Sequence, residues 1–489
     1  MRISLIYPLL SKERSLIDEN KQYWPPLGLA YIAAILEKNG HQVQIIDRDI
    51  FLYRYKFDFQ KIDEVTLKEI GSFKTDIVGI SATTPNISDV MHLTKLVKNS
   101  NPGIITVLGG PHATCEPSAT LKMCNSLDII VRGEGEFTML DLANRLPFEN
   151  INGISFRKKS VIINNPDRPL CAELDDLPFP ARHLLDMKFY TRPSRFGGKG
   201  LNLRITSIFS ARGCPYRCDF CAGYATFPGK VRFHSPERII EELTSIVENY
   251  SVEAVFFADD MFLSSKDRIK KLMQLLKENK KLKNLKWIAQ ARANVIDEEI
   301  LRLLKRSGCV GLEYGFESGS QRMLDIMNKR SSIEDNLKAA MLTRKVGLRF
   351  TSYIIVGYPQ ETESDFKKTV NFLKKAKPNL MAFSLFYPLP GTAIYKKLIA
   401  EEKEIPEWDR IGDPEAADIN YADMDKETFK KLYFKTRLIL ILPNNLYHYI
   451  KDNIRHPVNL FMALLLQSKG AIIKASRAVL YLLCNYGKK

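Results

Sequence analysis

The sequence predicts an α/β protein with a Rossmann-like, doubly wound domain, then a partial barrel of six β/α units and a helical carboxy-terminal region. Three observations support this order. Short apolar runs alternate with helical stretches over residues 1–150, the alternation resumes over 201–395, and strand-like runs cease after Thr392. Residues 151–200 are expected to form a linker, and residues 396–489 the helical region.

Five apolar runs in the first domain predict buried parallel strands, because they are continuous rather than alternating. They are Ile3–Tyr7, Val43–Asp47, Asp76–Ser81, Ile105–Gly109 and Asp128–Arg132. Helical stretches such as Leu27–Lys38, Asn86–Lys98 and Glu136–Leu146 separate them. We therefore expect a ligand site at the carboxyl ends of the strands, where the connecting loops are rich in glycine and small residues.

The linker contains a predicted hairpin, Ile154–Phe156 with Val161–Ile163, and the second array follows it. Its six strand candidates are Ile205–Ser210, Ala254–Ala258, Lys286–Gln290, Gly311–Phe316, Phe350–Val356 and Met381–Phe386. Six units are too few to close an eight-fold barrel, so an open, partial barrel is expected.

Composition and charge narrow the choice of compartment and partner. The 489-residue chain begins without a signal-peptide pattern and contains no uncharged apolar run of about 18 residues, so a cytoplasmic protein is expected. The net charge is +16, and Leu438–Lys489 holds seven Lys/Arg against one acid. This tail fits either peripheral contact with anionic lipid or a solvated helical cap. Basic residues form no aromatic-interleaved stripe, so nucleic acid is not an expected partner.

Three of the eight cysteines lie together, in the pattern Cys-x3-Cys-x2-Cys formed by Cys214, Cys218 and Cys221. Three thiolates at this spacing can bind three irons of a cubane cluster and leave the fourth iron open. A structural zinc site is the alternative, but zinc usually takes four protein ligands. No fourth ligand stands at a nearby spacing, since His234 lies thirteen residues further on.

The cysteine motif, with Phe220 before its last cysteine, resembles the signature of the radical S-adenosylmethionine (SAM) family. The resemblance implies a [4Fe–4S] cluster, SAM at the open iron, and cleavage of SAM to methionine and a 5′-deoxyadenosyl radical. It also implies a one-electron reductant such as flavodoxin or ferredoxin. Candidate SAM-binding residues follow successive strands: Asp259, Asp260, Arg292, Glu317 and Gly357. The acid pair also fits a strand end followed by a helix cap.

The first domain resembles the cobalamin-binding domain of the family typified by the anaerobic magnesium-protoporphyrin cyclase and related radical SAM methylases. Four loops carry the resemblance: Pro25-Pro-Leu-Gly28, Ser81-Ala-Thr-Thr84, Gly109-Gly-Pro-His112 and Gly133-Glu-Gly-Glu136. The Gly-x-Gly-x-x-Gly loop of nicotinamide and flavin domains is absent after the first strand. The resemblance implies cobalamin, with candidate binding residues Thr83, Thr84, Gly109, Gly110, His112, Gly133 and Glu134.

The domain departs from many cobalamin domains in one respect: it lacks Asp-x-His-x-x-Gly, whose histidine ligates cobalt from below. Thr83 and Thr84 are then expected to form a floor of small side chains beneath the corrin, while His112 is expected to pack or hydrogen-bond rather than bind cobalt. A domain that has lost cobalamin and serves as a scaffold is the alternative.

The resemblance implies a cobalamin-dependent radical SAM methyltransferase acting on an unactivated carbon of a small-molecule or lipid substrate. The alternative is cyclisation, ring contraction or rearrangement without net methyl transfer. A methylthiotransferase would need further clustered cysteines in the first domain, and Cys115, Cys124 and Cys171 do not cluster. A non-enzymatic cobalamin sensor would not need the cysteine triad.

Overall fold

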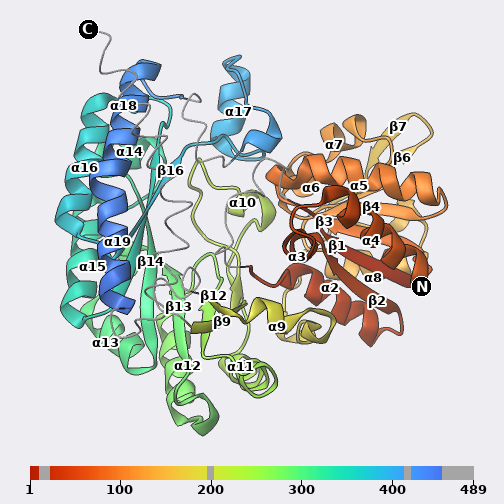
Figure 1. The fold of residues 1–489 in the computed structure, drawn as a ribbon, viewed down its shortest axis with the longest axis horizontal. Coiled ribbons are helices and arrows are strands. Elements are labelled where there is room, and N and C mark those ends of the chain that lie inside the picture. Colours follow the sequence, from red (N-terminus) through yellow and green to blue (C-terminus); the bar gives the residue numbers. More distant parts are fainter. Residues whose placement is uncertain (10–22, 195–202, 412–419, 454–489) are drawn as a thin grey trace.

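The computed structural model describes residues 1–9, 23–194, 203–411 and 420–453. Within these residues two sheets, each covered by helices, stand side by side, and the cysteine-bearing segment lies between them (Figure 1). The fold is the predicted α/β arrangement of a doubly wound domain followed by a partial barrel.

The first sheet has seven strands in the order β2-β1-β3-β4-β5-β6-β7. The strands are β1 (Arg2–Tyr7), β2 (Gln42–Asp47), β3 (Ile77–Ser81), β4 (Ile105–Gly109), β5 (Ile129–Val131), β6 (Ile154–Lys158) and β7 (Val161–Asn164). The first five are parallel, and the order changes direction at β1. Residues at the carboxyl ends of β3 and β4 and just after β5 line a cavity together with residues that follow β9 and β12. This edge is where a doubly wound sheet binds its ligand.

The hairpin of β6 and β7 corrects one expectation. The sequence places it in the linker, but β6 pairs antiparallel with β5 and extends the first sheet to Asn164. Ile154 and Phe156 are buried in the core of this domain, which is why the hairpin packs here rather than standing free.

The helices of the first domain cover both faces of its sheet. They are α2 (Leu27–Lys38), α3 (Arg48–Arg54), α4 (Phe59–Ser72), α5 (Ile87–Ser100), α6 (Pro111–Cys115), α7 (Pro117–Met123) and α8 (Glu136–Ala143), with a 3₁₀ turn η1 (Thr84–Asn86). α2 starts directly after Pro26, because proline occupies the first turn without needing an amide donor. Its apolar residues pack against β1 and α8.

The second sheet has the order β16-β15-β14-β13-β12-β9-β8. Six strands are parallel: β9 (Leu203–Ile208), β12 (Ala254–Phe257), β13 (Lys286–Ala291), β14 (Cys309–Glu317), β15 (Arg349–Val356) and β16 (Leu380–Leu385). The two-residue β8 (Pro193–Ser194) pairs antiparallel at the edge. The sheet is the expected open half-barrel.

Helices cover the outer face of the half-barrel (Figure 1). They are α11 (Pro236–Tyr250), α12 (Lys266–Glu278), α13 (Glu298–Arg306), α14 (Gln321–Ile326), α15 (Ile333–Val346) and α16 (Glu363–Ala376). Side-chain caps begin most of them: Ser332 and Thr362, for example, form capping boxes with Asp335 and Asp365.

Past the last strand the described chain is helical, as expected, with α17 (Ala393–Ala400), α18 (Lys426–Thr436), a π-helical turn (Arg437–Ile441) and α19 (Leu442–Asn453). Phe429 and Tyr433 of α18 are fully buried in the half-barrel core. Within the ranges described, no helix combines the length and apolarity needed to cross a bilayer. Most of the basic tail, residues 454–489, lies outside the described residues.

Candidate active site

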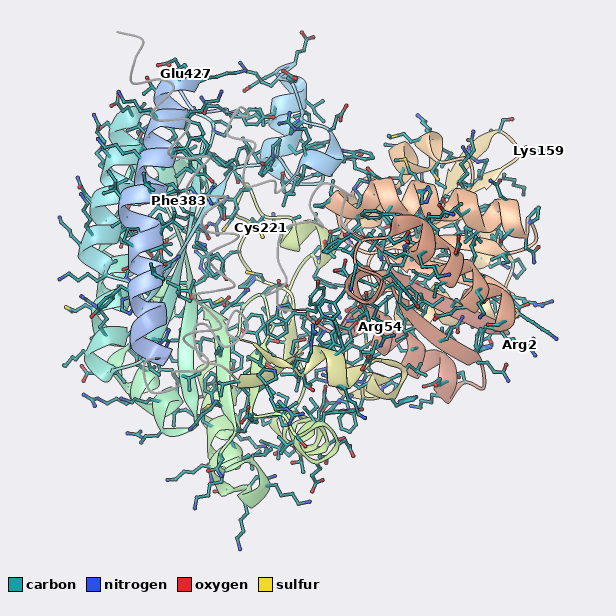
Figure 2. The ribbon with its side chains drawn as sticks, in the orientation of Figure 1. Arg2, Arg54, Lys159, Cys221, Phe383 and Glu427 are labelled. Carbon is teal, nitrogen blue, oxygen red and sulfur yellow. The ribbon has the colours of Figure 1, made fainter. Side chains whose placement is uncertain are left out.

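The three cysteines of the motif lie on one loop whose ends are joined. β10 (Ala211–Arg212) pairs antiparallel with β11 (Arg232–Phe233), so residues 213–231 form a closed loop that carries all three thiols. The loop follows β9 at the carboxyl end of the half-barrel, and Cys221 faces the space between the two domains (Figure 2). The sequence motif is thus held by a short ribbon directly after a barrel strand.

The thiols are accessible and influence one another's protonation. Cys214 and Cys218 are partly exposed, and Cys221 is exposed. Loss of hydration, together with the charges of Cys218, Asp260 and Cys214, raises the pKa of Cys221 to about 11. Two N–H groups point at sulfur: the Gly223 amide lies 3.4 Å from Cys221 Sγ, and Arg292 Nη1 lies 3.6 Å from Cys218 Sγ. Three neighbouring thiols with N–H donors fit a cluster, because iron binding deprotonates thiols and such donors stabilise cluster sulfur.

The two acids after β12 have different surroundings. Asp259 is fully buried, and its carboxylate accepts the amides of Ser210 (2.6 Å) and Ala211 (3.0 Å) as well as the Ser210 hydroxyl. Burial raises the pKa of Asp259 to about 6. The carboxylate therefore holds the start of the cysteine loop, which corrects the expectation that Asp259 faces a cofactor. Asp260 instead lines the cavity between the domains, where loss of hydration raises its pKa.

Arg292 follows β13 and reaches the cysteine loop. Its guanidinium stacks on the Tyr216 ring at 3.6 Å and donates to the carbonyl of Lys329 as well as to Cys218 Sγ. Its Nε is buried and has no hydrogen-bond partner among the described residues. The structure therefore places a fixed positive charge beside the cluster loop.

The remaining SAM candidates surround the same loop. Glu317 forms a buried ion pair with Lys329 (2.7 Å), and the Lys329 ammonium lies 5.8 Å from the centre of the Phe220 ring. Gly357 has a φ of +80° and donates its amide to Glu361 (2.6 Å). A Cβ at Gly357 would also approach Phe429 to 3.0 Å, so a larger residue does not fit.

A cavity of about 350 Å³ lies between the first domain and the cysteine loop. From the first domain it is lined by strand and loop residues that include Leu5, Gly79, Gly109, Gly110, Gly133, Glu134 and Gly135. From the second domain it is lined by residues that include Phe209, Ala211, Arg212, Phe227 and Asp260. Its walls are mostly apolar, with a few charged groups among them, as is typical of cofactor sites.

Glycines keep the cavity open. A Cβ at Gly79 would lie 3.0 Å from Leu5 Cδ2, and one at Gly135 would lie 3.0 Å from Ile32 Cδ1. Gly110 has a φ of +94°, and a Cβ there would lie 2.7 Å from the Ala82 carbonyl oxygen. Side chains larger than glycine are therefore excluded at these strand ends, and loops of such small residues suit the close approach of a corrin ring.

His112 packs and hydrogen-bonds, as the sequence led us to expect, and Thr84 is one of its partners. His112 is buried, with its ring nitrogens 3.2 Å from Thr84 Oγ1 and 3.1 Å from Thr120 Oγ1. The Trp408 ring packs edge-on against it at 4.5 Å, and burial lowers its pKa to about 4. Thr83 caps η1 through Asn86. None of the three is among the residues that line the described cavity, so their contact with the cofactor stays a prediction.

Sequence reasoning missed the charged residues that join the two domains. Glu134, predicted to bind a cofactor, lines the cavity but accepts hydrogen bonds from Arg212, Arg232 and the Cys171 amide. Arg212 also binds Glu136. The sequence offers one indication of Arg212's role, which is its position two residues before Cys214. Its partners lie more than 70 residues away in the chain, so no local pattern could identify them.

Comparisons with known proteins agree with this arrangement. The family model of the radical SAM superfamily matches residues 208–373, and that of the B12 binding domain matches residues 13–143. The chain is 33% identical over 380 residues to a protein of Pyrococcus horikoshii named as an uncharacterized methyltransferase, covering 77% of this chain and 79% of the relative. It is 28% identical over 409 residues to the anaerobic magnesium-protoporphyrin IX monomethyl ester cyclase of Rubrivivax gelatinosus, covering 81% and 70%.

Among solved structures, the radical SAM methyltransferase TsrM of Kitasatospora setae, determined with cobalamin and a [4Fe–4S] cluster, superimposes with a TM-score of 0.67. The match covers 82% of this chain and 78% of TsrM at 17% identity, and it supports the fold. The match to the B12 binding domain covers most of the doubly wound domain, and the radical SAM match covers the cysteine loop and most of the half-barrel. The chain therefore belongs to the radical SAM superfamily, among the members that carry a B12-binding domain before the half-barrel.

Proposed function

We propose that this chain transfers a methyl group to an unactivated carbon of a small-molecule or lipid substrate. One observation carries the proposal: a single cavity is lined by the strand-end glycines of the B12-binding domain and by residues adjoining the cysteine loop. When bound, the cluster and SAM supply a hydrogen-abstracting radical, and the corrinoid supplies the methyl group.

The chain's own residues have the following proposed roles. Cys214, Cys218 and Cys221 bind the cluster. Asp260, whose carboxylate lines the cavity, accepts a hydrogen bond from the SAM ammonium. The loops containing Gly109, Gly110 and Gly133 support the corrinoid.

The residues around the cluster serve electrostatics and the exclusion of water. Arg292 and Lys329 bring two cations to the thiolates and to the SAM carboxylate. Glu317 fixes Lys329, and the strand end that contains Gly357 flanks the adenine. Buried charges are effective here because little water screens them.

Radical SAM enzymes act on small-molecule substrates and use a reductant. We propose a one-electron donor such as flavodoxin or ferredoxin for this chain.

We also propose that the substrate is a lipid and that the chain contacts the membrane surface. The basic tail that starts at Leu438 and the exposed Ile439, Leu446 and Tyr447 support it. Liposome flotation of the full chain against a truncation after Arg437 tests it, and equal flotation would rule membrane contact out.

The test of the methyltransferase proposal is an anaerobic assay with reductant, methyl-labelled SAM and fractionated extract from the organism. Methyl transfer predicts S-adenosylhomocysteine and 5′-deoxyadenosine together, with label in one extracted compound. Deoxyadenosine without S-adenosylhomocysteine would indicate rearrangement or cyclisation, the activity class of the cyclase relative, and would contradict the proposal.

A further inference from the structure

Four buried charged side chains join the cysteine loop to the B12-binding domain. Arg212 places Nη1 2.8 Å from Glu134 Oε1 and Nη2 2.7 Å from Glu136 Oε1. Arg232 places Nη1 2.9 Å from the second oxygen of Glu134. The four side chains are at most 12% exposed, and their charges cancel. We call them the interdomain ion-pair cluster.

Both arginines belong to the ribbon that closes the cysteine loop. Arg212 and Arg232 are Cα partners across β10 and β11, so they stand at the two ends of residues 213–231. A change in the conformation of the cysteine loop moves the two arginines together. It therefore reaches the B12-binding domain through Glu134 and Glu136.

Both acids lie where the loop after β5 enters α8, and this segment forms part of the cavity wall. Glu134 and Glu136 alternate with Gly133 and Gly135, and all four line the cavity. On the other side of the ion pairs, Arg212 lines the same cavity. A ligand in the cavity therefore touches both partners of the interdomain ion-pair cluster.

The ion pairs between the two arginines and the two glutamates depend on charge and on the shape of the guanidinium group, not only on packing. Burial alone would raise the pKa of Glu134, but its hydrogen bonds to Arg232 and Arg212 outweigh burial and lower it. Arg212 uses two guanidinium nitrogens for two carboxylates, which the single ammonium of lysine cannot reproduce. Another ion pair of the first domain, Arg168 with Asp141, contacts neither the ribbon nor the cavity.

We infer that Arg212 and Glu134 are positioning residues that couple corrinoid binding to the conformation of the cysteine loop. The inference rests on the proposed function, because it takes the corrinoid as the ligand of the cavity. Cluster assembly fixes the loop, the loop fixes Arg212, and Arg212 fixes the cavity wall. Because such coupling is reciprocal, the cluster increases the affinity for the corrinoid by the same factor by which the corrinoid increases the affinity for the cluster.

The test measures the dissociation constant of hydroxocobalamin by visible absorbance, with full-length protein in cluster-free and cluster-loaded forms. For the wild type, loading should tighten binding by at least about fivefold, the lower end of typical coupling. Arg212→Gln should bring this ratio close to one. Arg212→Lys keeps the positive charge but can contact only one of the two carboxylates, so it should give an intermediate ratio. Arg168→Gln is the matched control and should keep the wild-type ratio.

A second variant guards against misfolding. Arg212→Gln leaves Glu136 buried without its cation, whereas Arg212→Gln/Glu136→Gln removes one charge of each sign and leaves the Glu134–Arg232 pair. The double variant should also give a ratio near one. A wild-type ratio of one, or a wild-type ratio retained by both variants, would overturn the inference while leaving the proposed function standing. A wild type that binds no hydroxocobalamin in either form would overturn the proposed function itself.

Discussion

Replacing Gly79 with valine should close the inner part of the corrinoid cavity. Gly79 lies in the middle of β3 and lines the cavity. A Cβ there would stand 3.0 Å from Leu5 Cδ2 and 3.4 Å from Met139 Cε. Ordinary carbon contacts are about 3.5–4.0 Å, so the two further methyl groups of valine must either displace these neighbours or enter the cavity.

The expected loss is at least a hundredfold in hydroxocobalamin affinity, or about 2.8 kcal/mol. Overpacking a core costs about 1–3 kcal/mol, and the expected loss lies near the upper end of that range. The cost applies to binding because the corrinoid must push the valine methyl groups out of the cavity and against their neighbours. Gly71→Ala is the matched control. Gly71 lies in α4 away from the cavity, and its Cβ would meet no atom within 4 Å, so affinity should stay within about threefold.

Visible absorbance titration gives both affinities, and circular dichroism melting shows whether Gly79→Val is folded at the assay temperature. Iron content after reconstitution should match the wild type, because Gly79 lies in the other domain from the cysteines. A folded Gly79→Val protein that binds hydroxocobalamin as tightly as the wild type would refute the assignment of this cavity to the corrinoid.

Three further predictions concern the half-barrel. Alanine at Cys214, Cys218 or Cys221 should abolish the four-iron cluster, measured as iron and sulfide per chain, while corrinoid binding persists at the cluster-free affinity; a full iron count in any variant would contradict the ligand assignment. Arg292→Gln should lower the reduction potential of the cluster by tens of mV in an electron paramagnetic resonance titration, because it removes a cation and an N–H donor from Cys218 Sγ; an unchanged or higher potential would count against it. Burial raises the pKa of Glu361 to about 8, whereas the pKa of an unfolded glutamate is about 4.3. Between these two pH values Glu361 is protonated in the folded state and ionised in the unfolded state. Wild-type stability should therefore fall by up to about 1.4 kcal/mol per unit as pH rises from about 4 to 8. Urea unfolding at several pH values measures this dependence, and in Glu361→Gln the free energy of unfolding should change less with pH than in the wild type. Equal pH dependence in the two proteins would show that Glu361 is ionised in the folded protein.

The sequence was sufficient where the determining residues are close together in the chain. The cysteine motif lies within eight residues, so its three thiols could be predicted to lie together, and the resemblance of the motif to the radical SAM signature implied its chemistry. The parallel strands are continuous apolar runs, so both sheets could be predicted. The hairpin at Ile154–Asn164 was also predicted, but its partner strand β5 depends on the tertiary fold, and local patterning could not supply it.

Predictions for single polar residues were weaker, because their roles depend on distant partners. Asp259 and Asp260 are adjacent, yet Asp259 is occupied by Ser210 and Ala211 while Asp260 lines the cavity. His112 follows a glycine pair typical of a ligand loop, but its nitrogens are taken by threonines. No pattern within one loop distinguishes these cases.

The central claim is that one chain holds a radical SAM cluster and a corrinoid at two separate but adjoining sites. The most direct test is to quantify iron, sulfide and corrinoid per chain after anaerobic reconstitution with hydroxocobalamin. The wild type should hold a four-iron cluster and a single corrinoid. The Cys214→Ala/Cys218→Ala/Cys221→Ala variant should lose the iron and still bind corrinoid, and Gly79→Val should lose the corrinoid and keep the iron. A wild type that holds iron but never corrinoid, or variants that lose both together while folded, would contradict the account.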